Sequence, residues 1–194
     1  QYGYTTGKNA TDSAMIIDAM DILYSEKVNG FCLVSSDSDF TRLATRLREA
    51  GMLVYGIGEK KTPNPFIVAC DKFIYIEILK QQTAKSETTA GDAVDDTKNT
   101  YDKITPKDIQ FIAATISDLA DDDGWAFLGD VGSLLQKKQP NFDSRNFWFE
   151  KLTPLIKSIG NFEIERREDY KGRSKLVYVK NKPKAAKRGG HRKK

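Results

Sequence analysis

Residues 31–40 read FCLVSSDSDF, and this stretch decides how the first half of the chain folds. Its apolar part, Phe31 to Ser35, is a short continuous run of the kind found in buried parallel strands. The acidic part follows at once and places Asp37 and Asp39 after the strand. Because open α/β sheets bind ligands outside the carboxyl ends of their strands, both carboxylates are candidates for a functional site.

The segments around this stretch continue an alternation of helices and strands. The pattern predicts a helix over Thr41–Ala50, a strand over Met52–Ile57, a short helix after Asn64 and a strand over Phe73–Ile76. A first helix, capped by Asn9 or Thr11 and running to about Glu26, carries one apolar stripe formed by Ala14, Ile17, Met20, Leu23 and Tyr24. This rhythm implies right-handed crossovers and a parallel sheet sandwiched by helices.

A second block follows residues 80–103, which have little to bury and are predicted to be a flexible linker. A helix opens at Thr105-Pro106 with Asp108 in its first turn, a second covers Leu128–Lys138, and a third begins at Asp143 or Ser144. Strands over Phe162–Arg166 and Leu176–Lys180 close the block as a hairpin. The pattern predicts a small winged helix-turn-helix α+β domain over residues 104–180, with a core of Phe127, Leu128, Leu134, Leu135, Phe142, Leu152 and Ile156.

Positive charge is concentrated at the end of the chain. The net charge is +4, yet residues 181–194 hold seven Lys or Arg and no acid, so residues 1–180 are slightly acidic. Residues 181–194 are therefore predicted to be a disordered basic tail that contacts phosphate, with a solubilising terminus as the alternative.

Cysteine and histidine usage excludes several kinds of site. Cys32 and Cys70 are too few and too far apart for a zinc framework and are interpreted as buried thiols, and His191 is the only histidine. No apolar run reaches the roughly 18 residues of a membrane span, and none resembles a secretory signal, so a cytoplasmic protein without membrane contact is expected. The first residue is Gln1, which suggests that residues are missing upstream.

The acidic residues fit metal chemistry. Asp37 and Asp39 can turn oxygens toward one hard cation, Mg²⁺ or Mn²⁺, and Asp12 in the first turn of the preceding helix adds a third carboxylate. The alternative is structural, because Asp and Ser also serve as ordinary turn and cap residues between a strand and a helix.

The stretches GKNATDSAMIIDAMDILYSEKVNGFCLVSSDSDFTRLATRLREAG and VYGIGEKKTPNPFIVACDKFIYIE, within about residues 5–79, resemble the NYN domains of LabA-like bacterial proteins, which are relatives of PIN nucleases. The resemblance implies a PIN-like Rossmannoid domain over residues 1–79 and a Mg²⁺-dependent ribonuclease site. Asp12, Asp37 and Asp39 fall on its acidic positions and Lys8 on the basic position before them, while Lys60 or Lys61 could hold phosphate. Such domains usually begin with a strand bearing an early Asp, which this chain starts too late to contain. Activity is therefore expected of the full-length protein, and this fragment is expected to be weak or inactive.

The run PNFDSRNFWFEKLTPLIKSIGNFEIERRE, with WAFLGDVGSLLQKK before it, resembles the LOTUS or OST-type helix-turn-helix domain. The resemblance implies RNA binding or a protein contact. Candidate RNA contacts near the third helix and on the wing are Lys137, Lys138, Arg145, Asn146, Lys151, Lys171, Arg173 and Lys175. For each of them, an ordinary solvated face is the alternative.

Together these features predict a metal-dependent endoribonuclease whose winged helix and tail recruit RNA, single-stranded or structured. One rival is a non-catalytic RNA-binding or protein-interaction scaffold, and another is a phosphate-transfer response domain, since doubly wound folds also gather Asp residues at strand ends. The choice of RNA over DNA comes from the resemblance alone. A homodimer stays open.

Overall fold

The computed structural model describes residues 10–79, 102–168 and 175–183. The chain divides into two compact units, one formed by residues 1–103 with 135–148 and the other by residues 104–134 with 149–194. Each unit is described by itself below. None of the helices in the described ranges is both long and apolar enough to cross a membrane.

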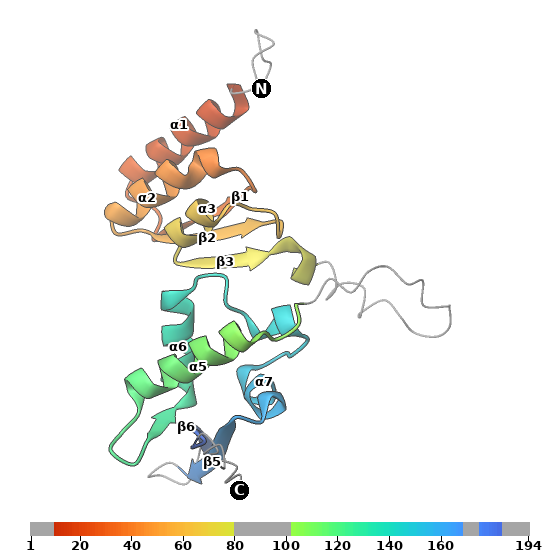
Figure 1. Cartoon of the computed structure of the whole chain (residues 1–194). Helices are drawn as coiled ribbons and strands as arrows, with labels where there is room; N and C mark the ends of the chain where they lie inside the picture. The colour runs from red at the N-terminus through yellow and green to blue at the C-terminus, as the bar shows by residue number, and fades with distance from the viewer. Residues whose placement is uncertain (1–9, 80–101, 169–174, 184–194) are drawn as a thin grey trace, which may run out of the picture. The chain divides into compact units, whose positions relative to one another are not determined.

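The first unit is built on a parallel sheet of order β1-β2-β3 (Figure 1). Its strands are β1 (Gly30–Val34), β2 (Leu53–Gly58) and β3 (Lys72–Tyr75). Helices α1 (Ala10–Tyr24), the short η1 (Ser38–Phe40), α2 (Thr41–Glu49) and α3 (Asn64–Ala69) accompany the strands, and residues 76–79 are helical too, so the predicted strand does not include Ile76. This arrangement confirms the mixed α/β class with a parallel sheet that the sequence predicts.

Helices α1, α2 and α3 cover one face of the sheet, so the prediction of a sandwich is wrong for residues 10–75. Consecutive right-handed crossovers that advance in one direction leave their helices on the same face. On that face Leu33, Val54 and Phe73 are buried together with α2 and α3. On the opposite face Val34 is 64% exposed and Leu53 is 56% exposed.

Two further predictions fail for related reasons. Cys32 lies on the uncovered face and is exposed, whereas Cys70 is buried as expected. On α1, Ala19 and Leu23 are buried in the core and Met15, Ile16 and Met20 pack against it, while Ile17 and Tyr24 of the predicted stripe are 60% and 69% exposed. Both errors arise because an apolar residue does not reveal which face its neighbours will cover.

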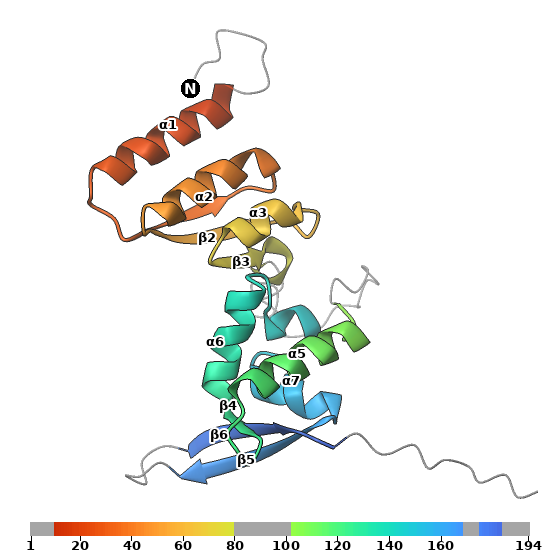
Figure 2. The same cartoon turned by 60° about the vertical axis from the view of Figure 1, so that its left-hand side comes forward.

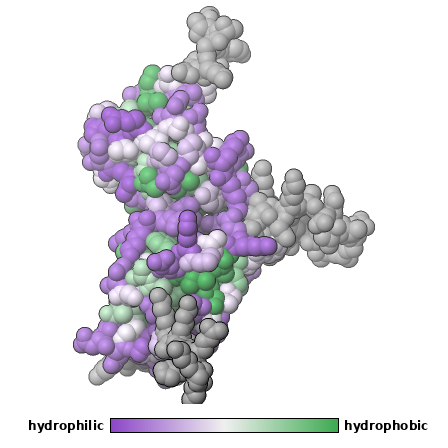
Figure 3. Space-filling view, in the orientation of Figure 1, coloured by the Kyte–Doolittle hydropathy of each residue, from purple (hydrophilic) through white to green (hydrophobic). Residues whose placement is uncertain are grey.

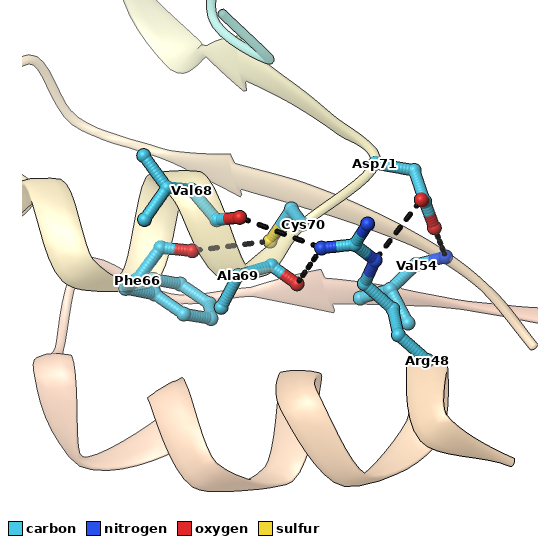
Figure 4. Close-up of polar contacts among 7 residues, drawn as sticks. All are labelled: Arg48, Val54, Phe66, Val68, Ala69, Cys70 and Asp71. Atoms are coloured by element: carbon cyan, nitrogen blue, oxygen red, sulfur yellow. Dashed lines mark hydrogen bonds and ion pairs between the residues drawn. The ribbon is translucent and has the colours of Figure 1, made fainter. Parts of the chain in front are cut away.

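One arginine ties the end of α2 to the end of α3 and to β2 (Figure 4). The Arg48 Nε atom lies 3.0 Å from Asp71 Oδ1, and a terminal nitrogen of its guanidinium donates to the Ala69 carbonyl at 3.4 Å. The other carboxylate oxygen of Asp71 accepts the Val54 backbone N–H at 2.9 Å. Arg48 therefore supplies a donor to a carbonyl that a helix end leaves without an intrahelical partner.

The C-terminal part of the chain contains α5 (Pro106–Leu119), β4 (Trp125–Phe127), α6 (Leu128–Lys138), η2 (Ser144–Phe147), α7 (Leu152–Ile159), β5 (Phe162–Glu168) and β6 (Lys175–Asn181). The predicted hairpin forms β5 and β6, which pair antiparallel, and β4 adds a strand that the sequence pattern did not predict. The predicted third helix is divided, because Trp148 adopts a left-handed conformation, with φ of 74°, between η2 and α7.

Apolar residues reach the surface of both units between hydrophilic ones (Figure 3). Of the predicted core of the C-terminal part, Leu128, Leu135, Phe142 and Ile156 are buried. Phe127 is only half-buried, because its ring packs beside Tyr178 on a face of the sheet and not in the interior.

Candidate functional site

The acidic loop, defined here as Ser35 to Asp39, begins where β1 ends and is fixed to the end of β2. The Ser35 backbone N–H donates to the Ile57 carbonyl at 2.9 Å, which extends the strand pairing by one residue. The Ser36 hydroxyl oxygen accepts the Glu59 backbone N–H at 2.8 Å. Two neighbouring strands therefore position the loop at the carboxyl edge of the sheet, as the sequence predicts.

Gly58 lets the loop approach β2 closely. A Cβ atom at Gly58 would lie 2.7 Å from the Thr62 hydroxyl oxygen and in still closer contact with the Ser35 carbonyl oxygen. Contacts this short do not occur between real Cβ atoms and their neighbours. The absence of a side chain at Gly58 is thus a condition for the position of the loop.

Within the acidic loop, Asp37 has a structural role as well as a candidate chemical one. It precedes η1, and its Oδ1 accepts the Asp39 backbone N–H at 3.0 Å, while its own N–H donates to the Ser35 hydroxyl at 3.1 Å. Both Asp37 and Asp39 are exposed. Capping uses one carboxylate oxygen, so the structural and the chemical interpretations of Asp37 are compatible.

The two loop carboxylates line separate hollows. Asp37 borders an open hollow of about 430 Å³ with the neighbouring serines and Pro63. Asp39 borders a second hollow of about 260 Å³, which lies between α1 and α2 and is also lined by Arg42 and Arg46. These arginines stand one turn apart on the helix that follows the loop, and sequence reasoning missed them, although their spacing of four residues was a readable signal.

Asp12 lies in the first turn of α1 and is half-buried. Across residues 10–79, 102–168 and 175–183, no group of three or more His, Cys, Asp or Glu side chains is placed to hold a metal ion. The assignment of Asp12, Asp37 and Asp39 as metal ligands stays a prediction.

Several predicted phosphate contacts already have partners inside the protein. The Lys60 ammonium lies 2.9 Å from Asp102 Oδ1, and the Lys61 ammonium lies 2.6 Å from Glu59 Oε2. The pKa of Lys61 is raised by its hydrogen bond to Glu59. Lys8, the third predicted phosphate contact of this domain, lies outside the described residues.

Arg145 is held by Asp143. Its Nε and a terminal nitrogen donate to the two oxygens of Asp143 at 2.9 and 2.6 Å. Burial of Asp143 favours its neutral form, but the hydrogen bonds from Arg145 outweigh this effect and the pKa of Asp143 is lowered. Because the pair is bidentate, Arg145 has a clear structural role, and its contact with RNA stays a prediction.

Asn146, another predicted contact, is 6% exposed, and its amide donates to the Asn141 carbonyl. Lys137 and Lys138, in the last turn of α6, and Lys151, which precedes α7, are exposed. Lys175 begins β6 and is exposed as well. Lys171 and Arg173, the predicted contacts on the wing, lie outside the described residues.

Comparison with known families now identifies the class of protein. Residues 1–77 match the model of the NYN domain, and residues 102–173 match that of the OST-HTH/LOTUS domain. The chain therefore contains an NYN domain followed by an OST-HTH/LOTUS domain. NYN domains are generally nucleases, and OST-HTH/LOTUS domains bind RNA.

Two solved structures, both determined by NMR in solution, are similar to the chain. One is an uncharacterized protein from Nitrosomonas europaea, with 30% sequence identity, coverage of 51% of this chain and 92% of that chain, and a TM-score of 0.40. The other comprises residues 175–257 of a protein from Chromobacterium violaceum, with 22% identity, coverage of 49% of this chain and 100% of that chain, and a TM-score of 0.35. No curated protein matches the chain.

Proposed function

We propose that this protein is a metal-dependent endoribonuclease whose OST-HTH/LOTUS domain and basic tail recruit RNA. The observation that carries the proposal is the position of Asp37 and Asp39, which follow β1 at the carboxyl edge of the sheet of an NYN domain. Support for RNA as the substrate comes from the second domain.

The donor chemistry of the acidic loop suits a hard cation, because exposed carboxylate oxygens are the ligands that Mg²⁺ and Mn²⁺ prefer. A bound ion of this kind would lower the pKa of a water molecule and neutralise developing phosphate charge. Asp37 and Asp39 would hold it, with Asp12 as the third carboxylate. Among the described residues, no group of three such side chains is placed to hold a metal ion.

Arg42 and Arg46 are the cations that the NYN domain places beside Asp39. We assign them the binding of the phosphate next to the cleaved bond, because they line the same hollow as Asp39. Lys60 and Lys61 would first have to leave their carboxylate partners, which makes them weaker candidates for the same task.

The test is a cleavage assay on single-stranded and structured RNA with Mg²⁺ or Mn²⁺. It is run on this chain and on the chain extended upstream through the strand that the resemblance predicts. We expect cleavage that needs the metal and falls at least about 100-fold in Asp37→Asn, because such a step depends on the charge that the ligands supply. Asp21→Asn, on the exposed side of α1, is the matched control and should cleave like the unaltered chain.

A non-catalytic RNA-binding scaffold is the second candidate, and it is favoured by the position of Asp37 and Asp39 on separate hollows. RNA binding without cleavage in both the short and the extended chain would establish this function in place of the nuclease. Cleavage that persists in Asp37→Asn would remove the acidic loop from the proposal. A cytoplasmic location, a homodimer and a protein partner of the OST-HTH/LOTUS domain stay predictions.

A further inference from the structure

One face of the β4-β6-β5 sheet carries a cluster that neither domain assignment explains. This cluster, called the aromatic face below, consists of Trp125, Phe127, Arg167, Tyr178 and Lys180. In the register of the strands, Trp125 lies opposite Lys180 and Phe127 opposite Tyr178. Arg167 comes from the neighbouring strand β5.

The aromatic face points away from the helices. The other face of the sheet carries Ala126 and Val179, which are 2% and 0% exposed. The Asn181 amide on that covered side donates to the Ala113 carbonyl in α5 at 2.9 Å. Figure 2 shows α5 and α7 on the same side of the sheet. Because successive side chains of a strand alternate between faces, Trp125, Tyr178 and Lys180 are directed to the opposite, uncovered side.

The guanidinium of Arg167 lies over the rings as a second layer. The centroids of Phe127 and Tyr178 are 5.8 Å apart, and the guanidinium carbon of Arg167 lies 4.5 Å from the Tyr178 centroid and 5.3 Å from that of Trp125. Glu165 holds Arg167 in this place through hydrogen bonds of 3.2 and 3.0 Å. The Lys180 ammonium lies 5.8 Å from the Trp125 ring and donates one of its hydrogen bonds to the Asp123 carbonyl. The layer is half-buried and therefore accessible at its outer surface.

The side chains of the aromatic face and the charge of the surrounding sequence indicate which kind of ligand this face can bind. Unpaired nucleobases stack on aromatic rings and on guanidinium planes, whatever their sequence. The sequence from the start of β5 to Pro183 holds seven Lys or Arg and four Asp or Glu, which attracts a polyanion, while Asp121 beside Trp125 reduces the positive charge at the face itself. An apolar protein segment on the same face would bury Arg167, Glu165 and Lys180, which is costly for charged groups.

We propose that the aromatic face is a stacking platform for unpaired bases of single-stranded RNA. Bases stack on the free side of the Arg167 guanidinium, which lies over Tyr178, and on the accessible part of Trp125, while Lys180 contacts a phosphate. The proposal rests on the RNA-binding part of the proposed function and specifies it, since it names the surface and requires unpaired bases. Glu165 neutralises Arg167 locally, so stacking contributes more than charge to binding at this face.

The experiment uses the full chain and a fluorescent 12-nucleotide single-stranded RNA of A and U, with EDTA present so that no cleavage occurs. Anisotropy gives the affinity at several salt concentrations, and the same strand in a duplex serves as the second ligand. Trp125→Leu is expected to weaken binding of the single strand about tenfold or more, as loss of one stacked base does. Its salt dependence should stay close to that of the unaltered chain, and duplex binding should change little.

The two tryptophans of the chain offer a control and a direct readout. Trp148→Leu removes an exposed tryptophan outside the sheet and should bind the single strand normally. In a Trp148→Phe background, the fluorescence of Trp125 should be quenched when the single strand binds. Circular dichroism of each variant separates loss of binding from loss of fold.

The platform is overturned if the folded Trp125→Leu and Tyr178→Leu variants bind the single strand as the unaltered chain does. It is also overturned if Trp125→Leu weakens binding of the duplex as much as binding of the single strand. The same holds if Trp148→Leu weakens binding of the single strand as much as Trp125→Leu does. If the unaltered chain binds RNA and Trp125→Leu binds it with the same affinity, only the platform fails. If it binds RNA through the platform and never cleaves RNA, only the nuclease proposal fails.

Discussion

The two cysteines differ in their exposure to solvent, which governs the reactivity of a thiol. Cys70 is buried, and its thiol donates to the Phe66 carbonyl at 3.4 Å (Figure 4). Burial raises the pKa of Cys70 to about 12, although the nearby Arg48 acts in the opposite direction. Cys32 is exposed on the uncovered face of the parallel sheet. Since the thiolate is the reactive species, Cys70 should be inert in the folded protein.

We therefore predict that a thiol reagent at pH 8 modifies one cysteine of the folded chain quickly and the second only on unfolding. Cys32→Ser should remove the fast reaction and Cys70→Ser should preserve it. Mass spectrometry of the labelled peptides identifies the site. Rapid modification of two thiols under native conditions would contradict the burial of Cys70.

Single residues also show what local sequence can reveal. Thr105, Pro106 and Asp108 predict a helix start, and the structure contains the full capping box, with the Thr105 N–H donating to Asp108 at 2.8 Å. The partner of Arg145 was not foreseen, although Asp143 is only two residues away, because a charged pair in sequence does not reveal whether its members face each other or solvent.

At the scale of the elements, the end of β2 and the acidic loop form one structural feature. We predict that Gly58→Ala lowers the free energy of unfolding by about 1–3 kcal/mol, since an added methyl group must displace the Ser35 carbonyl or its neighbours. Urea denaturation followed by circular dichroism measures the loss. The variant should also reduce any activity that depends on Asp37.

Gly51→Ala is the matched control. Nothing lies within 4 Å of a Cβ at Gly51, but its φ of +81° disfavours alanine, so this change should cost roughly 1 kcal/mol without moving the acidic loop. Equal loss of Asp37-dependent activity in both variants would show that stability, and not the position of the loop, limits that activity.

The elements that sequence predicted best are those with local signals. The five-residue strand β1 has a continuous apolar run, and α6 was predicted with its observed bounds. The three-residue strand β4 was missed because its pairing partner, β6, lies about 50 residues away in sequence. The break before α7 was missed because Trp148 takes a backbone conformation that a bulky residue seldom adopts.

At the scale of the whole molecule, charge is distributed unevenly along the chain. Residues 184–194 hold six Lys or Arg, and the described part of the chain ends just before them. We predict that removing these residues lowers the slope of log affinity against log salt for single-stranded RNA by up to about 4, at about 0.7 for each phosphate contact. Trp125→Leu should leave that slope nearly intact, which separates charge from stacking.

An unchanged slope after this removal would favour the alternative of a solubilising terminus.

The two-domain order was readable from sequence because long joint patterns are specific, and both family matches confirm it. The candidate metal site could not be settled in the same way, because the position of Asp12 relative to the acidic loop depends on how α1 packs. Sequence spacing fixes neither that packing nor the separate hollows of Asp37 and Asp39.

The close approach of Gly58 to the Ser35 carbonyl also restricts which residues can occupy this position during evolution. The serines of the acidic loop can be exchanged for other small polar residues during descent, because their hydrogen bonds have chemical substitutes. No other residue type can substitute for the missing side chain of Gly58 while the Ser35 carbonyl keeps its place. Among descendants of a common ancestor, we therefore expect glycine at this position even in proteins that have lost the carboxylates of the acidic loop.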